Sequence, residues 1–319
     1  MIKPVLAIHG GAGAITRAQI IPAVKLAYED ALRSILAGGE RILANGGSAL
    51  DAVTEAVRLL EECPLFNAGH GAVFTRDATH ELDASIMDGS TLACGAVANV
   101  RTIRNPVRAA RAVMEHSPHV FFAGDNADAF AREQGLEIVD SSFFSTPDRH
   151  AQLIKAQETG VDSIVLDHDG VVDQPPLDES KKMGTVGAVA LDAHGNLAAA
   201  TSTGGMTNKW PGRVGDSPII GAGCYANNAS CAVSTTGKGE AFIRAVAAYD
   251  VAAMMEYTGV SLEHAAHKVV YEKLPPLDGA GGLIAVDKHG NITMPFNTEG
   301  MYRGSVVVGQ AALVAIYRE

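Results

Sequence analysis

Short apolar runs separated by turn residues predict buried strands in several parts of the chain. They lie at residues 5–8, 81–87, 95–100 and 120–123, and a further run begins directly at Thr185. Helical spacing predicts helices over 22–44, from Ser48 onward, over 106–116 and 126–134, from Pro147, and over 240–257 and 261–274. Asp51 follows Ser48 at the spacing of a capping box. Strands and helices therefore share the whole chain, as in an α/β protein.

The second half of the chain contains an internal repeat. Residues 187–206 and 282–301 each read as a strand, an Asp-x-His-Gly-Asn turn, a second strand and a Thr-x-Gly-Met corner. Backbone geometry explains the turn residues His194 and His289, which we interpret as structural. We expect the two hairpins to be neighbours in one antiparallel sheet. The order of elements predicts sheets enclosed by helices, an α/β/β/α layering, rather than a doubly wound parallel sheet.

A polar stretch from about 157 to 184 interrupts these patterns. It contains only one short apolar run, 164–166, and is the best linker candidate in the sequence. It stops at Thr185, where a strand begins. A processing site needs such an accessible chain, although a plain surface loop would have a similar composition.

Gly184 and Thr185 stand at the end of this linker. Thr185 supplies a hydroxyl on a β-branched carbon, and Gly184 leaves the adjoining carbonyl sterically open. Cleavage between them would give Thr185 a free amine, whose ordinary pKa is about 7.7–8.0. The hydroxyl and its base would then lie in one residue, as in N-terminal threonine nucleophiles.

Composition narrows the class of protein. The 319 residues are 47% apolar and 19% charged, which suits one large domain or two ordinary ones with a sizeable core. The net charge of −11 argues against nucleic acid and anionic membranes as partners. We expect no signal peptide and no membrane span. The four cysteines lack metal or redox spacing, so we expect reduced thiols and a cytoplasmic protein.

Two segments invite a ligand interpretation. The glycine cluster at 9–13 follows a strand, but it lacks phosphate-loop spacing, so a core strand or a tight turn is favoured. Glu61, Glu62 and His70 match no zinc pattern, and a solvated helix end is the default interpretation. A helix C-terminus nevertheless exposes carbonyls that can surround a hard monovalent cation.

Groups suited to amide hydrolysis cluster downstream of Thr185. A tight hairpin would bring Thr203 back to hydrogen-bond the nucleophile. Residues 234–240 lead into a helix, whose start would form a candidate oxyanion hole. Arg213 and Asp216 could clamp the α-carboxylate and α-amine of an amino acid. Each feature alone is better explained as a surface turn, and only their clustering favours a site.

Several long motifs are similar to one known family. They are His9-Gly10-Gly11-Ala12-Gly13, Asn67-Ala68-Gly69, Met183-Gly184-Thr185-Val186-Gly187, Thr201-Ser202-Thr203-Gly204-Gly205, Pro211-Gly212-Arg213-Val214-Gly215-Asp216-Ser217-Pro218 and Gly221-Ala222-Gly223-Cys224-Tyr225-Ala226. Together they resemble the isoaspartyl peptidase/L-asparaginase family, the plant-type (type III) asparaginases among the N-terminal nucleophile hydrolases. The bacterial branch looks closest, and the resemblance spans nearly the whole chain.

The resemblance implies one four-layer α/β/β/α domain that cleaves itself into an α subunit, 1–184, and a β subunit, 185–319. The implied catalytic residues are Thr185, Thr203, Thr236, Gly237 and Asn67, and the implied substrate-binding residues are Arg213, Asp216, Gly237 and Gly239. A sodium loop, called the cation loop below, would use the backbone carbonyls of Leu60, Glu61, Cys63, Phe66, Ala68 and His70. No cofactor is implied for catalysis, and the αβ units would form a dimer.

Departures from the family pattern occur at Lys238, at His70 and in the tail. Lys238 stands where bacterial members carry a small hydroxyl residue, so we expect it to alter substrate binding beside Thr236. His70 replaces a small or apolar residue beside the cation loop. Residues 304–314 depart from a more polar ending and read as an apolar strand.

The resulting hypothesis is a threonine hydrolase that deamidates L-asparagine and cleaves β-aspartyl dipeptides through a β-aspartyl ester on Thr185. One alternative is a glycosylasparaginase, which shares the nucleophile chemistry. Another is an uncleaved amino-acid-binding protein. Intact mass separates the last, because an active enzyme requires two chains with the second starting at Thr185.

Overall fold

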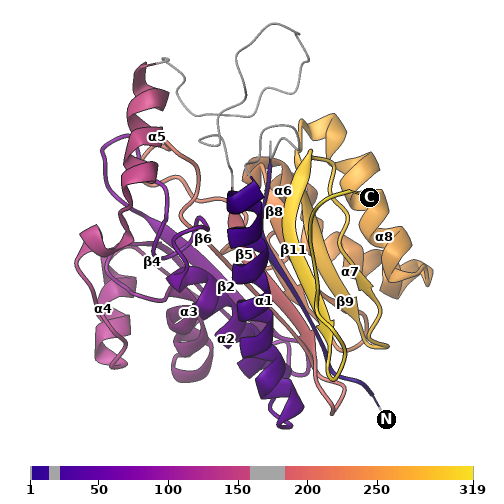
Figure 1. Ribbon diagram of the computed structural model, residues 1–319. Coiled ribbons are helices and arrows are strands. Elements are labelled where there is room, and N and C mark those ends of the chain that lie inside the picture. The colour runs from indigo at the N-terminus through magenta and orange to yellow at the C-terminus, as the bar shows by residue number, and fades with distance from the viewer. Residues whose placement is uncertain (1, 14–21, 159–183, 319) are drawn as a thin grey trace, which may run out of the picture.

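The computed structural model describes residues 2–13, 22–158 and 184–318. Two β-sheets lie face to face, and helices cover the outer face of each, so that the layers run helix, sheet, sheet, helix (Figure 1). The predicted α/β/β/α layering is confirmed.

The larger sheet draws its strands from both halves of the chain. Within the described residues its order is β12 (Leu313–Tyr317), β11 (Gly300–Val307), β1 (Val5–Gly13), β5 (Thr185–Leu191), β6 (Leu197–Thr203), β2 (Leu82–Asp88), β3 (Cys94–Val100) and β4 (Phe121–Ala123). Neighbouring strands are antiparallel, except that β3 and β4 are parallel. Thr185 therefore begins a strand in the middle of the sheet.

The smaller sheet and the helices complete the layers. In the described part of the chain this sheet has the order β10 (Ile292–Thr293), β9 (Gly281–Asp287), β8 (Cys231–Gly237) and β7 (Cys224–Ala226). Helices α1 (Pro22–Ala44), α2 (Ala49–Glu62) and α3 (Pro106–His116) pack on the larger sheet, and α6 (Gly239–Ala245), α7 (Ala247–Thr258) and α8 (Leu262–Lys268) pack on the smaller one. Helix α4 (Asp125–Glu133) packs near β4, and α5 (Pro147–Glu158) follows it.

The alternation of side chains along the strands explains the layers. On β1, Leu6 and Ile8 join the apolar core beneath α1 and α2, whereas Val5 and Ala7 join the core between the two sheets. A third core lies between the smaller sheet and α6 to α8. Both faces of the central strands are thus buried, which is why these strands read as continuous apolar runs.

Local signals in the sequence are reproduced. The Ser48 side chain accepts a hydrogen bond from the Asp51 backbone N–H at 3.1 Å, which caps α2. Ser261 caps α8 in the same way. The glycine cluster at 9–13 belongs to strand β1, with a register irregularity between His9 and Gly11, so the core-strand interpretation is confirmed.

The prediction that the two hairpins are neighbours in one sheet is wrong. The β5–β6 hairpin lies in the larger sheet and the β9–β10 hairpin in the smaller one, with β5 packed across from β9. Both repeats bury apolar side chains on two faces, so they meet through those faces rather than through backbone edges.

Other boundaries also differ from prediction. The expected helix at 240–257 is broken at Val246, which adopts a left-handed conformation with φ 48°. The helix expected at 261–274 is α8 followed by a π-helical turn, Val269–Lys273. The tail at 304–314 is not one strand, because β11 ends at Val307 and β12 begins at Leu313.

The predicted linker lies largely outside the described residues, which end at 158 and resume at 184. Its expected start at 157 falls inside α5, which runs to Glu158. No helix in the described ranges combines the length and apolar character needed to cross a membrane.

Candidate active site

Thr185 is the buried first residue of β5. It pairs in register with Thr203 at the end of β6, and its hydroxyl lies 3.3 Å from the Thr203 hydroxyl. The Thr203 hydroxyl also lies 3.5 Å from the Gly184 carbonyl oxygen and accepts a hydrogen bond from the Gly205 N–H at 3.0 Å. The hairpin therefore returns Thr203 to Thr185, as predicted, and Thr203 contacts both sides of the Gly184–Thr185 bond.

Asn67 holds the chain that follows Thr203. Its side-chain amide donates to the Gly205 carbonyl at 2.7 Å and accepts from the Val73 N–H at 2.9 Å, while its backbone carbonyl accepts from the Gly204 N–H at 3.1 Å. Asn67 is buried behind the Thr203 corner. This geometry suits a residue that orients the site.

Thr236 and Gly237 are the last residues of β8, and α6 begins just beyond them at Gly239. The Thr236 hydroxyl accepts a hydrogen bond from the Ala12 N–H at 3.3 Å. Gly237 has φ +149°, and a Cβ at this position would lie 2.2 Å from the Ala280 carbonyl oxygen. Only glycine fits that position without a shift of the backbone.

Arg213 is already engaged by a carboxylate. Its guanidinium donates two hydrogen bonds of 3.0 Å to the carboxylate of Glu240. This bidentate geometry is the one that a guanidinium uses to bind a ligand carboxylate. Glu240 was not among the predicted site residues, because nothing in its surroundings along the chain links it to Arg213.

Asp216 is fully buried beside Arg213. Burial raises the pKa of its carboxyl to about 6, and this rise is opposed by a hydrogen bond from the Thr235 hydroxyl and by the charge of Arg213. The Thr235 hydrogen bond is 2.7 Å long. Thr235 was missed by sequence reasoning, although it stands in the Ser-Thr-Thr run that pointed to Thr236.

A small cavity joins the predicted nucleophile to the predicted clamp. Its volume is about 10 Å³, at the lower limit of the space that can hold one water molecule. The residues that line it are Gly184, Thr185, Thr203, Gly205, Met206, Arg213, Gly215, Asp216, Ser217 and Gly237. Asn67, Thr236 and Gly239 do not line the cavity but adjoin residues that do. The Ser217 hydroxyl, which was not predicted, lies 3.5 Å from the Thr185 hydroxyl.

His9 is a buried residue of β1 that pairs with Gly187 of β5. Its ring contacts the Ser234 hydroxyl at 2.9 Å, and Ser234 contacts the Thr201 hydroxyl at 2.7 Å. Burial lowers the pKa of His9 to about 3, so the imidazole is neutral near pH 7. This buried chain supports β5 from the face opposite to α2.

The predicted cation loop folds back on itself after α2. The carbonyls of Leu60, Glu61 and Cys63 accept hydrogen bonds within the loop, and Glu61 accepts from the His70 N–H at 2.7 Å. Within the described residues, the carbonyls of Phe66, Ala68 and His70 accept none from backbone N–H groups. Carbonyl oxygens of this kind fit a hard monovalent cation. No cluster of metal-binding side chains occurs among the residues that the structure describes.

Side chains around this loop have other partners. The His70 ring packs edge-on against Phe143, with ring centroids 5.2 Å apart. The Glu61 carboxylate accepts hydrogen bonds from the Ser202 hydroxyl at 2.7 Å and the Val107 N–H at 2.9 Å. Burial raises the pKa of Glu61 to about 8. The loop is thus linked to β6, one residue before Thr203.

Lys238, like His70 a departure from the family pattern, forms an ion pair with Asp278.

Comparison with known proteins supports a single assignment across the chain. The family described as asparaginase matches residues 2–316. The isoaspartyl peptidase of Escherichia coli (strain K12) is 63% identical over 319 residues, which cover 100% of this chain and 98% of that protein. The isoaspartyl peptidase of Salmonella typhimurium is 62% identical and covers 100% of both chains. The isoaspartyl peptidase/L-asparaginase of Rattus norvegicus is 41% identical over 310 residues, 97% of this chain and 88% of that protein.

Proposed function

This chain belongs to the asparaginase family, and we propose that it is an autoprocessing threonine hydrolase that deamidates L-asparagine and cleaves β-aspartyl dipeptides. The observation that carries the proposal is the position of Thr185. It begins a central buried strand, with the Thr203 hydroxyl 3.3 Å away, and shares one cavity with Arg213 and Asp216. The names of the relatives favour β-aspartyl substrates over glycosylated asparagine.

In maturation, Thr185 acts on its own peptide bond. Its hydroxyl attacks the Gly184 carbonyl carbon, and the acyl group moves from the Thr185 nitrogen to its oxygen. Water then hydrolyses the ester, leaving a carboxylate on Gly184 and a free amine on Thr185. Thr203, 3.5 Å from the Gly184 oxygen, donates a hydrogen bond to that oxygen as negative charge develops. The products are the chains 1–184 and 185–319.

In turnover, the freed amine of Thr185 takes the proton from the hydroxyl, which attacks the side-chain carbonyl of the substrate. Thr236 and Gly237 stabilise the oxyanion of the tetrahedral intermediate. Ammonia leaves from asparagine, or an amino acid leaves from a β-aspartyl dipeptide. Water hydrolyses the β-aspartyl ester on Thr185 and releases aspartate.

The substrate is held by its backbone groups. Asp216, with the Gly239 carbonyl, binds the α-ammonium, and Arg213 binds the α-carboxylate. Because Glu240 occupies the Arg213 guanidinium in the free site, substrate binding exchanges one carboxylate for another. Asn67 orients the corner between Thr203 and Gly205.

Further parts of the proposal concern the environment of the enzyme. A sodium ion held by the carbonyls of the cation loop would stiffen the connection between α2 and β6, without a role in bond breaking. The αβ units would associate as a dimer. All four cysteines are free, which supports a reducing compartment such as the cytoplasm.

The substitution Thr185→Ala tests the proposal directly. We expect one full-length band on a denaturing gel and no hydrolysis of L-asparagine or a β-aspartyl dipeptide, because the variant lacks the nucleophile of both steps. Thr185→Ser is the matched control, since it keeps the hydroxyl and should still cleave, although more slowly. A Thr185→Ala chain that splits in two would refute the mechanism.

A further inference from the structure

The segment that leads from Thr203 to Arg213 carries polar side chains that are shielded from water. Thr207, Asn208 and Lys209 are all buried, and Lys209 is only 2% exposed. A buried ammonium group is costly unless it is paired and hydrogen-bonded. The maturation and turnover steps described above use none of these residues. Their burial therefore calls for a partner in the surrounding strands.

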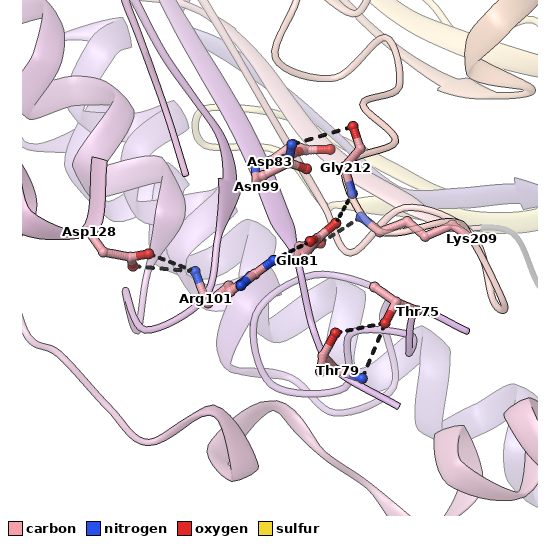
Figure 2. Close-up of polar contacts among 9 residues, drawn as sticks. All are labelled: Thr75, Thr79, Glu81, Asp83, Asn99, Arg101, Asp128, Lys209 and Gly212. Carbon is pink, nitrogen blue, oxygen red and sulfur yellow. Dashed lines mark hydrogen bonds and ion pairs between the residues drawn. The ribbon is translucent and has the colours of Figure 1, made fainter. Parts of the chain in front are cut away.

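Glu81, the residue just before β2, meets this segment at two points (Figure 2). Its backbone carbonyl accepts a hydrogen bond from the Lys209 ammonium at 2.8 Å, and its carboxylate accepts one from the Gly212 N–H at 2.8 Å. The other carboxylate oxygen pairs with Arg101 at 2.7 Å. Since Gly212 directly precedes Arg213, the Glu81 carboxylate fixes the backbone from which the clamp side chain extends.

Asn99 at the adjacent strand β3 makes a second contact with Gly212. Its side-chain amide lies 3.5 Å from the Gly212 carbonyl, and its own N–H donates to the Asp83 carboxylate at 2.8 Å (Figure 2). Asn99 has φ +54°, a conformation that non-glycine residues adopt at a cost. Both backbone polar groups of Gly212 are thus contacted by side chains, one from β3 and one from the residue that precedes β2.

Strand β2, which follows Glu81, also lies close to the nucleophile. Asp83 on β2 stands opposite Thr203 on β6 in the register of the sheet. Thr203 in turn pairs with Thr185. The start of β2 therefore adjoins Thr203, and Glu81, the residue just before β2, holds the Arg213 segment. A rigid strand with both attachments fixes the distance between nucleophile and clamp.

We propose that Glu81 is a positioning residue for the substrate α-carboxylate, acting through Gly212 on Arg213. Lys209 and Asn99 hold the same segment in place. The inference rests on the proposed function, in which Arg213 binds that carboxylate. A bidentate guanidinium–carboxylate pair depends on orientation, so a displaced Arg213 backbone weakens it.

The variant Glu81→Gln, made in the full-length chain, tests this role. Glutamine has nearly the same size but replaces one acceptor oxygen with a donor, so it cannot accept from both Arg101 and Gly212. We expect the KM for L-asparagine to rise about tenfold with kcat changed less than about twofold, because the lost interaction is far from the reacting carbonyl. Cleavage into two chains should remain complete.

A substrate analogue separates positioning from a general structural role. The α-carboxamide of L-asparagine lacks the group that Arg213 binds, so Glu81→Gln should leave its kcat/KM within about twofold of the unsubstituted enzyme. The matched control is Asp128→Asn. Asp128 is a buried carboxylate that accepts from the Arg101 and Thr102 N–H groups but does not contact the 209–212 segment, and its variant should keep the KM unchanged.

Asn99→Gly provides a second variant that relieves the positive φ and removes only the side-chain amide. Its KM for L-asparagine should rise about threefold, in line with one lost hydrogen bond, so it tests independently whether the attachment of Gly212 positions Arg213. An unchanged KM for L-asparagine in Glu81→Gln overturns the role of Glu81. An equal loss of kcat/KM on L-asparagine and on its α-carboxamide overturns it as well. An unsubstituted chain that neither cleaves itself nor hydrolyses L-asparagine overturns the proposed function instead.

Discussion

Asp216 must be ionised to bind an ammonium group, yet burial raises the pKa of its carboxyl to about 6. The binding of L-aspartate, the proposed product, should therefore weaken as the pH falls through 6. We expect about tenfold weaker binding at pH 5 than at pH 7, because one pH unit below the pKa leaves about a tenth of the carboxyl groups charged. Titration calorimetry at several pH values measures this.

Thr235 provides the control for the pH dependence. Its hydroxyl donates to Asp216 and favours the ionised carboxylate. Thr235→Val keeps the shape but removes that donor, so the loss of L-aspartate binding should begin at higher pH. A titration curve that does not move in this variant would contradict the assignment of the transition to Asp216.

Gly237→Ala should damage both stability and turnover. The new methyl group would lie 2.2 Å from the Ala280 carbonyl oxygen, so the end of β8 has to shift. We expect a stability loss of about 1–3 kcal/mol in denaturant unfolding and a large fall in kcat. Gly309→Ala is the control, since Gly309 also has a positive φ but nothing within 4 Å, and it should lose stability without losing kcat.

A site residue can be predicted from the sequence when the residues next to it along the chain belong to the same site. Thr185 stands at a visible junction, and Arg213 and Asp216 lie in one short loop. Glu240, Thr235 and Glu81 are different, because each acts on a partner far away in sequence. The contact between Gly212 and Glu81, for instance, joins residues 131 positions apart. Only the folded sheet brings such pairs together.

At the scale of elements, Val246 shows how a helix prediction can fail. Apolar spacing runs through 240–257 without interruption, but Val246 adopts φ 48° and separates α6 from α7. The spacing of apolar residues indicates which face of a helix is buried, but it does not indicate where the helix axis changes direction. The hairpin prediction failed for a related reason, since the repeats revealed two similar units but not whether they meet by edges or by faces.

Val246 also offers a test of local strain. A β-branched residue is disfavoured in the left-handed region, and its side chain is 46% exposed, so little packing depends on it. Val246→Asn should raise the free energy of unfolding by about 0.5–1 kcal/mol, because asparagine tolerates this conformation better. Val246→Ala removes the branch but lacks the tolerance of asparagine for this conformation, so its gain in denaturant unfolding should be smaller than that of Val246→Asn.

At the scale of the whole molecule, the halves on either side of Gly184–Thr185 are interleaved. Strand β1 from the first half lies between β11 and β5 from the second, and β2 from the first half pairs with β6. Three strand-to-strand ladders therefore join residues before and after the proposed cut.

This interleaving predicts that the cleaved chains stay together. They should co-elute in gel filtration and separate only in denaturant, since separation requires the loss of three ladders and of the shared core. A polypeptide that begins at residue 185 and is expressed alone should not be recovered as a folded protein. Dissociation of the cleaved chains in dilute buffer would contradict this arrangement.

The interleaved strands also change the order of the folding reaction. The uncut chain folds in a first-order process, with its halves held at a high effective concentration by the connecting segment. Once that connection is cut, refolding becomes a collision between two unfolded polypeptides, and its rate depends on their concentration. Thr185→Ala should refold at a rate independent of dilution, whereas the mature enzyme should not. The mature enzyme would then persist because it unfolds slowly, since the fast first-order folding is open only to the uncut chain.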